Sequence, residues 1–204
     1  VRVTDAAGNS PSDLTIAVTV TDVNDQTPTY TSSDTTPNIA EQTTAVETLT
    51  VTDTDTGDVN ACTLGGADAS SFSCTVNGDS VSLAFSSAPD FENPGSVDSD
   101  NDYSVTVTIS DGVNTGATIS YTVTVDDAND FTPTYSAGDL TPSVAEGSTA
   151  VDSFTVSDAD TDDVNACIRG GADAALFTCS VSGDDITLAF ASAPDYDSAS
   201  DANS

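Results

Sequence analysis

The chain has 204 residues, with 34 acidic side chains against two basic ones and a formal net charge of −32. Nucleic acid is bound through a basic surface, so this charge excludes a nucleic-acid partner. The absence of His and Lys excludes Ser–His, Cys–His and Ser–Lys nucleophile pairs, and with them the usual Cys/His zinc sites. No apolar run approaches the ~18 residues of a membrane-spanning helix, so we expect no membrane insertion in this segment.

Hard oxygen donors, mostly Asp, are the chemistry that the chain has in quantity. Hard oxygens in number suit calcium, so Ca²⁺ is the candidate cofactor that the composition suggests. Composition alone leaves two alternatives open: carboxylate-only catalysis, as in glycosidases, and an acidic surface that is merely solvated.

The sequence repeats with a period of 105 residues, as the spacing between Cys62 and Cys167 shows. We predict the final strands of one repeat in residues 1–25, a complete repeat in 26–130, and a repeat lacking its last strands in 131–204. Such a division is typical of a window cut from a longer tandem array. We expect the chain either to continue covalently on both sides or to receive the missing strands from neighbouring chains.

Apolar residues alternate with polar ones along each repeat, which is the period of a β-strand. In chain order, strands are expected over 46–51 (with one irregular step), 72–76, 81–85, 103–109 and 119–125. Asn77-Gly78 between the second and third of these predicts a tight hairpin turn. Roughly seven short strands in a ~100-residue unit predict an all-β fold, a two-sheet antiparallel sandwich.

Each repeat carries two cysteines separated by 12 positions: Cys62 with Cys74, and Cys167 with Cys179. We predict one disulfide within each repeat and therefore an oxidising, extracellular compartment. The alternative is a pair of buried free thiols in each repeat.

The acidic residues recur in frame at the expected strand ends. A Glu stands near the start of each repeat, a D-x-D follows the first clear strand, a D-x-E follows the hairpin, an Asp-Gly ends a later strand, and a D-x-N-D-x-x-P linker closes each unit. In the complete repeat these are Glu41, Asp53 with Asp55 and Asn60, Asp90 with Glu92, Asp111-Gly112, and 127–133. Turn formation and solvation of strand ends are the alternative roles for these residues.

These five motifs, in this order and at this period, resemble the calcium-binding motifs of the cadherin family. The resemblance extends over all 204 residues. The amino-acid sequences of 65–72 and 89–94 are more similar to cadherin-type repeats of bacterial surface proteins than to animal cadherins. The resemblance to the cadherin family implies tandem cadherin-like, immunoglobulin-like Greek-key sandwiches that form a linear rod, with calcium at the junctions between repeats.

The resemblance also implies a ligand set for each junction. For the second junction the residues are Glu41, Asp90, Glu92, Asn129, Asp130, Asp158 and Asp160, with the backbone carbonyls of Ala128, Phe131 and Asn165. For the first junction they are Asn24, Asp25, Asp53, Asp55, Asn60 and Asp111.

The function that these features predict is a calcium-rigidified, non-enzymatic segment of a large cell-surface adhesin or stalk, whose partners are the adjacent repeats of the same protein. One alternative is a structural subunit of an extracellular filament or sheath, joined to neighbouring subunits by strand exchange. A carbohydrate-binding module is a weaker alternative, because the chain has no Trp and several of its aromatic residues fall on core-facing positions.

Overall fold

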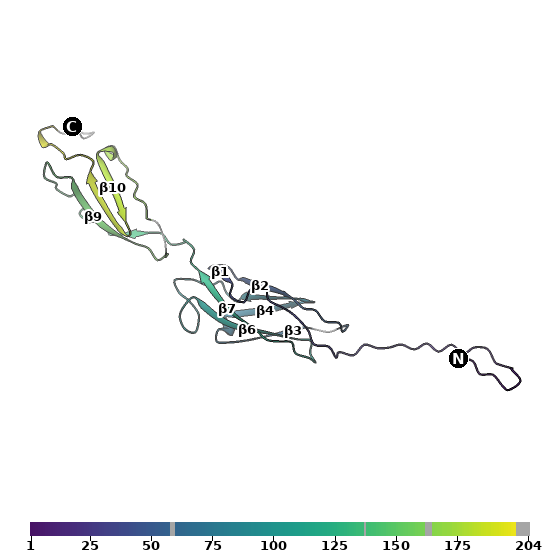
Figure 1. Cartoon of the computed structure of the whole chain (residues 1–204). Coiled ribbons are helices and arrows are strands. Elements are labelled where there is room, and N and C mark those ends of the chain that lie inside the picture. The colour runs from purple at the N-terminus through teal and green to yellow at the C-terminus, as the bar shows by residue number, and fades with distance from the viewer. Residues whose placement is uncertain (58–59, 137, 162–164, 199–204) are drawn as a thin grey trace.

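The structure is a computed structural model that describes all residues except 58–59, 137, 162–164 and 199–204. It contains two β-lobes that lie in line along an elongated molecule, with an N-terminal segment extending away from them (Figure 1). We call residues 26–130 the first lobe and residues 131–198 the second lobe. The described residues contain no helix with the length and apolar character needed to cross a membrane.

The first lobe is a sandwich of two sheets. One sheet has the strand order β1-β7-β6-β3 and the other the order β2-β5-β4. The strands are β1 (Asn38–Ala40), β2 (Ala45–Thr50), β3 (Ala61–Gly65), β4 (Phe72–Asn77), β5 (Ser80–Phe85), β6 (Asp102–Ser110) and β7 (Ile119–Asp126), and the 3₁₀ turn η1 (Ala69–Ser71) precedes β4. The expected all-β sandwich is confirmed, and the irregular step in the first clear strand is a bulge between Ala45 and Glu47.

Alternation along the strands places the apolar side chains between the two sheets. In β6, Tyr103, Val105, Val107 and Ile109 are all buried, and β7 contributes Tyr121, Val123 and Val125. The Phe72 and Phe85 rings stack with their centroids 4.5 Å apart, and Tyr103 meets both edge-on. The hairpin turn between β4 and β5 contains Gly78 at φ 60°, a conformation that glycine adopts without strain.

One strand pairing departs from the antiparallel arrangement that the sequence predicts. β1 runs parallel to β7, with Ile39 opposite Val125. The chain first bridges the other sheet through Thr29 and Thr52 and then crosses to the edge of β7. It reaches that edge heading in the same direction as β7, toward the linker that leads to the second lobe.

Among its described residues, the second lobe forms only one of the two sheets. This sheet has the order β10-β11-β9-β8, from the strands β8 (Thr134–Tyr135), β9 (Ala150–Ser157), β10 (Phe177–Ser182) and β11 (Asp185–Phe190), with short 3₁₀ turns η2 (Ala174–Leu176) and η3 (Tyr196–Ser198). β9, β10 and β11 lie 105 residues after β2, β4 and β5. Positions 143–145 and 166–170, which correspond to β1 and β3, are not strands among the described residues.

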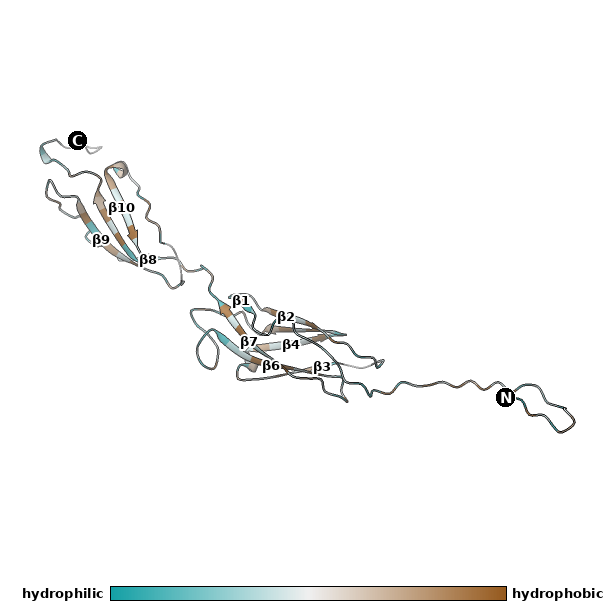
Figure 2. Ribbon diagram, viewed as in Figure 1, coloured by the Kyte–Doolittle hydropathy of each residue, from teal (hydrophilic) through white to brown (hydrophobic). Residues whose placement is uncertain are grey.

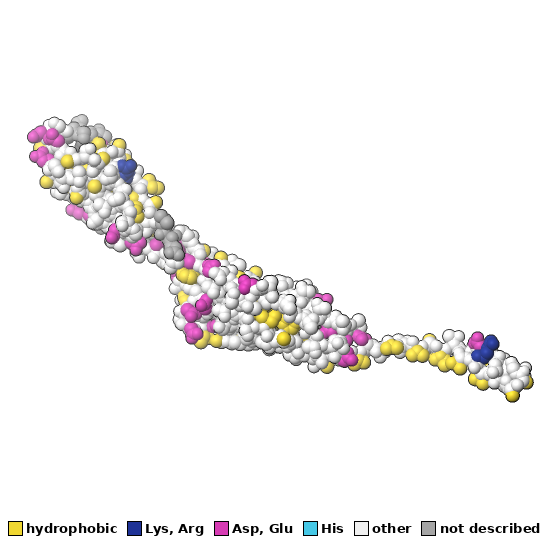
Figure 3. All heavy atoms as spheres, in the orientation of Figure 1, with side chains coloured by type: hydrophobic (Ala, Val, Ile, Leu, Met, Phe, Trp, Pro, Cys, Tyr) yellow, Lys and Arg dark blue, Asp and Glu magenta, His cyan; other side chains and the backbone are white. Residues whose placement is uncertain are grey.

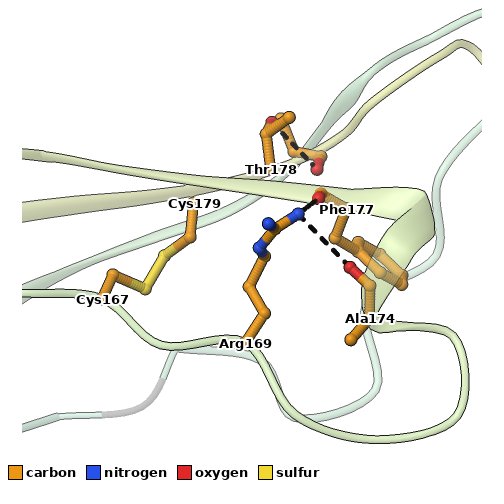
Figure 4. Close-up of a disulfide and its surroundings, with 7 residues drawn as sticks. Cys167, Arg169, Ala174, Phe177, Thr178 and Cys179 are labelled. Atoms are coloured by element: carbon orange, nitrogen blue, oxygen red, sulfur yellow. Dashed lines mark hydrogen bonds between the residues drawn. A yellow bond between two sulfur atoms is a disulfide. The ribbon is translucent and has the colours of Figure 1, made fainter.

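The two predicted disulfides are confirmed. Cys62 is bonded to Cys74 and Cys167 to Cys179, with Cα atoms 6.2 and 6.0 Å apart. In the second lobe, Arg169 reaches past its disulfide and donates to the carbonyl oxygens of Ala174 and Phe177 (Figure 4). The disulfide and Arg169 together fasten the segment after residue 166 to β10.

Residues 1–25 contain no assigned strand and lie outside both lobes (Figure 1). The hydropathy colouring shows apolar residues recurring along this exposed segment, and they are visible at its surface (Figures 2 and 3). The assignment of these residues to the end of a preceding repeat stays a prediction.

Candidate metal centre

The linker after β7 is fastened to the loop that follows β9. The Asp127 carboxylate accepts hydrogen bonds from the backbone N–H and the hydroxyl of Thr161. The Phe131 N–H donates to Oδ2 of Asp160 at 2.9 Å, and the Asp160 N–H donates to Oδ1 of Asp158 at 3.2 Å. The contact therefore joins an aspartate of the first lobe, Asp127, to the loop of the second lobe that carries Asp158 and Asp160.

Glu41 fastens the same linker to the first lobe from the other side. The residue follows β1 directly and only 4% of its surface is exposed. Its Oε2 accepts the Phe91 N–H and its Oε1 accepts the Ala128 N–H, both at 2.9 Å. One buried carboxylate thus ties the loop that carries Glu92 to the first residues of the linker.

The carboxylates converge in two overlapping groups at this junction. Glu41, Glu92 and Asp127 offer oxygen atoms that all lie within 4.8 Å of one another. Glu92, Asp130 and Asp160 form a second group with the same spacing. Glu92 belongs to both groups, so a continuous cluster runs from the first lobe, through the linker, to the second lobe.

The electrostatics of the cluster are those of crowded like charges. Burial raises the pKa of Glu92, and the negative charges of Glu41 and Asp127 raise it further. Burial, followed by the charges of Glu41, Asp160 and Asp90, likewise raises the pKa of Asp130. Asp127 has a lowered pKa because the Thr161 hydroxyl and N–H bond to its ionised form.

Several oxygen atoms of the cluster are buried and accept no hydrogen bond from the described residues. They are both carboxylate oxygens of Glu92, Oδ1 of Asp127 and Oδ2 of Asp158. A buried, charged oxygen without a partner is costly, whereas a divalent cation both neutralises it and satisfies it. The donor set consists of hard oxygens alone, so the residues fit calcium.

The first junction repeats the same docking of the linker. The N–H groups of Asp25 and Gln26 donate to Oδ2 of Asp55 at 2.8 and 2.6 Å, and Asp22 accepts from the N–H and hydroxyl of Thr56. Oδ2 of Asp53 is buried there and accepts no hydrogen bond from the described residues. The two junctions are therefore built on one plan.

Asn114 secures the far side of this first linker. Its side-chain amide donates to Oδ1 of Asn24 at 2.9 Å and to the Gln26 carbonyl. Asp111, which is buried, accepts the N–H groups of Val113 and Asn114. Burial opposes ionisation of Asp111, but these hydrogen bonds hold its pKa below its ordinary value.

The structure brings some of the predicted ligands together and places others aside. Glu41, Glu92, Asp130 and Asp160 share the two groups. Oδ1 of Asp90 accepts the Asn93 N–H, and the Asp90 charge still acts on Asp130. The roles predicted for Asn129 and for the carbonyls of Ala128, Phe131 and Asn165 stay predictions.

Two of the predicted Asn ligands, Asn60 and Asn165, turn their side-chain amides toward the hairpins. Asn60 donates to the Gly78 carbonyl at 3.3 Å, and Asn165 donates to Oδ1 of Asp184 at 3.2 Å. Oδ1 of Asn60 is buried and accepts no hydrogen bond from the described residues.

Sequence reasoning left out one member of the cluster. Asp127 was not among the predicted ligands, although its carboxylate lies within 4.8 Å of those of Glu41 and Glu92. The available signal was its recurrence as the first Asp of both D-x-N-D linkers, Asp22 and Asp127. The spacing in the sequence did not show that the Asp127 side chain lies near Glu41 and Glu92 rather than in solvent.

No protein-family model and no curated protein matches the chain. Solved structures do match. Cadherin domains 1–4 of protocadherin gamma B7 share 22% identity over 86% of this chain and 44% of that one, with a TM-score of 0.53. Domains EC1–2 of human protocadherin-24 share 20% over 88% and 82%, with a TM-score of 0.53. The human desmocollin-1 ectodomain shares 17% over 95% and 39%, with a TM-score of 0.55.

These matches show a cadherin-like fold. The chain spans less than half the length of the protocadherin gamma B7 structure and 28% of a protocadherin gamma B4 extracellular domain. The fold expected from the sequence is therefore confirmed by comparison as well as by the sheets themselves.

Proposed function

We propose that the chain is a calcium-rigidified repeat segment of an extracellular adhesion or stalk protein, and that it acts without enzymatic activity. The observation that carries the proposal is the position of Glu92. Its two unpartnered oxygens join a carboxylate group of the first lobe to one that includes the linker and the second lobe. A cation bound at Glu92 would contact the first lobe, the linker and the second lobe. These are the parts that must stay fixed if the two lobes are to form a stiff rod.

Glu41, Glu92, Asp127, Asp130, Asp158 and Asp160 are the side chains that would hold calcium at the second junction. The bound ion supplies positive charge that cancels the repulsion among these carboxylates. The protein's own part is to orient them: Glu41 through Phe91 and Ala128, and Asp127 through Thr161. Without the cation the same charges push the linker and the loops apart.

The setting proposed for this segment is extracellular, at a cell surface. Two disulfides in a chain of this size favour an oxidising compartment, and the large acidic excess keeps an exposed rod soluble. The similar solved structures are extracellular domains of protocadherins and the ectodomain of desmocollin-1. Adjacent repeats of the same protein are the partners that the junctions fit.

Calorimetry and small-angle scattering on the whole chain, with calcium and with chelator, test the proposal. We expect calcium binding in the range of extracellular modules, about 10⁻⁴–10⁻³ M, and a change from a flexible to a stiff particle. Glu92→Gln should weaken both effects. Glu47→Gln is the matched control, because Glu47 is a half-buried Glu of the same lobe that bonds Ser32, Ser33 and Tyr121 away from the junction.

The outcome that contradicts the proposal is an absence of calcium binding together with scattering that chelator does not change. Equal effects of Glu92→Gln and Glu47→Gln would place calcium elsewhere than at this junction.

A further inference from the structure

The second lobe presents an open apolar face where the first lobe has its second sheet. Val144, Phe154, Cys167, Phe177 and Leu188 line adjoining hollows on the inner side of its single sheet. In the first lobe, the corresponding space is filled by β6 and β7, whose inward side chains are buried. The Phe177 and Phe190 rings stack as Phe72 and Phe85 do, but both remain partly exposed.

Residues 1–25 carry the apolar pattern that fills this space in the first lobe. Val1 and Val3 occupy the frame positions of Val107 and Ile109, and Leu14, Ile16, Val18 and Val20 those of Ile119, Tyr121, Val123 and Val125. The residues in the first lobe lie in its core, whereas those in the segment are exposed, Val18 at 80% and Val20 at 90%. An exposed apolar segment and an exposed apolar face thus occur in the same molecule.

The N-terminal hairpin already has the register of β6 and β7. Val1 and Leu14 exchange two backbone hydrogen bonds, of 2.6 and 2.9 Å. They are the frame counterparts of Val107 and Ile119, which are opposite one another in the β6–β7 ladder. Arg2 and Asp13, joined by an ion pair of 2.7 Å, stand where Thr108 and Thr118 exchange a hydrogen bond of 2.8 Å.

The loop of this hairpin also matches the one that ends β6. Oδ1 of Asp5 accepts the N–H groups of Ala7 and Asn9, and Oδ2 accepts the Asn9 amide at 3.0 Å. Asp111 makes the same three contacts to Val113 and Asn114, in a loop shorter by one residue. At the turn, Pro11 takes the position of Gly116, so the match is best along residues 1–9 and 14–21.

The acidic residues at the two ends of the molecule also correspond to the two sides of the second junction. In the second lobe, Oε2 of Glu146 accepts the Tyr196 N–H at 3.2 Å, just as Glu41 accepts the Phe91 N–H. The position equivalent to Ala128, whose N–H completes the Glu41 contact, is Val23 at the other end of the chain. Asp195 and Asp197 lie in the frame positions of Asp90 and Glu92.

We propose that residues 1–25 of one copy of this chain add to the open face of the second lobe of another copy. Residues 1–4 would pair with 166–169 as β6 pairs with β3, and residues 19–21 with 143–145 as β7 pairs with β1. The seam would bring Glu146, Asp195 and Asp197 of one copy to Asp22 and Asp25 of the other. This last step rests on the proposed calcium function, while strand addition rests on the apolar faces alone.

A second copy is the occupant because the geometry separates the two parts within one chain. Residues 1–25 leave the first lobe at the end opposite the second lobe (Figure 1). Addition between copies therefore joins them head to tail, and the pair keeps one unpaired N-terminal segment and one open face. Repetition of such a heterologous contact produces a filament rather than a closed dimer.

Cysteine cross-linking between two differently labelled chains tests the pairing. One chain carries Thr19→Cys and the other Ser143→Cys, the frame counterparts of Thr124 and Asn38, which are opposite one another between β7 and β1. The native cysteines are paired in disulfides and do not compete. With a mild oxidant we expect a mixed dimer, and Ser10→Cys in place of Thr19→Cys should give at least tenfold less.

Sedimentation of the unmodified chain provides the second measurement. We expect a concentration-dependent series of oligomers, lost in Val18→Asp and kept in Val97→Asp, a control at an exposed Val of the first lobe. A chain that stays monomeric at millimolar concentration overturns the proposal. So does a cross-link that forms within a single chain carrying both Thr19→Cys and Ser143→Cys.

The two proposals can fail separately. Calcium binding at the second junction is measured in Val18→Asp, where strand addition is blocked. If that variant binds calcium while the wild-type chain stays monomeric, only strand addition fails. If cross-linking proceeds while calcium binds nowhere, strand addition stands and the calcium function fails.

Discussion

Replacing Glu41 by Gln separates the structural and the electrostatic parts of the junction. The substitution keeps the shape of the side chain and removes its charge. It also turns one of two oxygens that accept backbone N–H groups, those of Phe91 and Ala128, into an amide donor. Loss of the hydrogen bond lowers the stability of the first lobe, whereas loss of the charge raises it by removing repulsion. The net effect of Glu41→Gln should therefore depend on whether calcium is bound.

The two opposing contributions have similar magnitudes when calcium is absent. Loss of a hydrogen bond to a charged group costs about 1.5–3 kcal/mol of unfolding free energy. Glu41 lies within 4.8 Å of Glu92, and two charges at that distance repel by about 1 kcal/mol in a water-like dielectric and about 3.5 kcal/mol at an effective dielectric of 20. Relief of this repulsion offsets the lost hydrogen bond to within about 2 kcal/mol.

With calcium bound, the repulsion is already cancelled and only the loss remains. We expect Glu41→Gln to lower calcium affinity at least about tenfold, which adds about 1.4 kcal/mol of destabilisation at saturating calcium. The measurement is urea unfolding in excess calcium and in chelator, followed by tyrosine fluorescence, since the chain has five Tyr and no Trp. Glu47→Gln is the control, and its cost should be the same in both conditions.

A cost of Glu41→Gln that is identical with calcium and with chelator would refute this reasoning. It would mean that Glu41 serves only to hold Phe91 and Ala128 in place.

Three further predictions concern other parts of the molecule. Asp130→Ala should weaken calcium binding in calorimetry far more than Asp98→Ala, because Asp98 belongs to neither carboxylate group; equal effects would refute the ligand assignment. Replacing Cys62 and Cys74 by Ala should lower the unfolding free energy of the first lobe by about 3 kcal/mol in urea, and an unchanged midpoint would contradict this. Burial opposes ionisation of Glu47, but hydrogen bonds from serine and tyrosine donors hold its pKa below its ordinary value. Its contribution is therefore present at neutral pH and lost as pH falls through that lowered pKa, so in chelator the advantage of wild type over Glu47→Gln should shrink by roughly 1 kcal/mol in acid.

The sandwich could be predicted from sequence because its strands have one buried face each. Alternation along 103–109 and 119–125 fixes which side chains point inward, and the structure buries those side chains. The hairpin at Asn77-Gly78 follows from local turn chemistry. The parallel entry of β1 could not be predicted, because it depends on how the chain crosses from one sheet to the other.

The candidate metal centre was harder to predict than the fold. The resemblance to cadherin motifs implied most of its carboxylates, such as Glu41 and Glu92, and the structure brings these together. The contact between Asp127 and Thr161 spans 34 residues and joins two lobes, and no local pattern announces it. Residues 166–170 illustrate the same limit: they carry the pattern of β3, but strand formation also requires a partner strand.

The arrangement of apolar and charged contacts separates the folding of a lobe from its orientation. The core cluster of the first lobe ends at Val125, and among the described residues no member of it belongs to the second lobe. The hydrogen bonds that hold the linker to the second lobe have carboxylate acceptors, Asp127 for Thr161 and Asp160 for Phe131. Apolar burial and the disulfide therefore hold the first lobe together independently of calcium, while the junction depends on charge. A change in calcium should then alter the angle between the lobes well before it unfolds the first lobe, because the two carboxylate groups that repel without the ion lie at the junction.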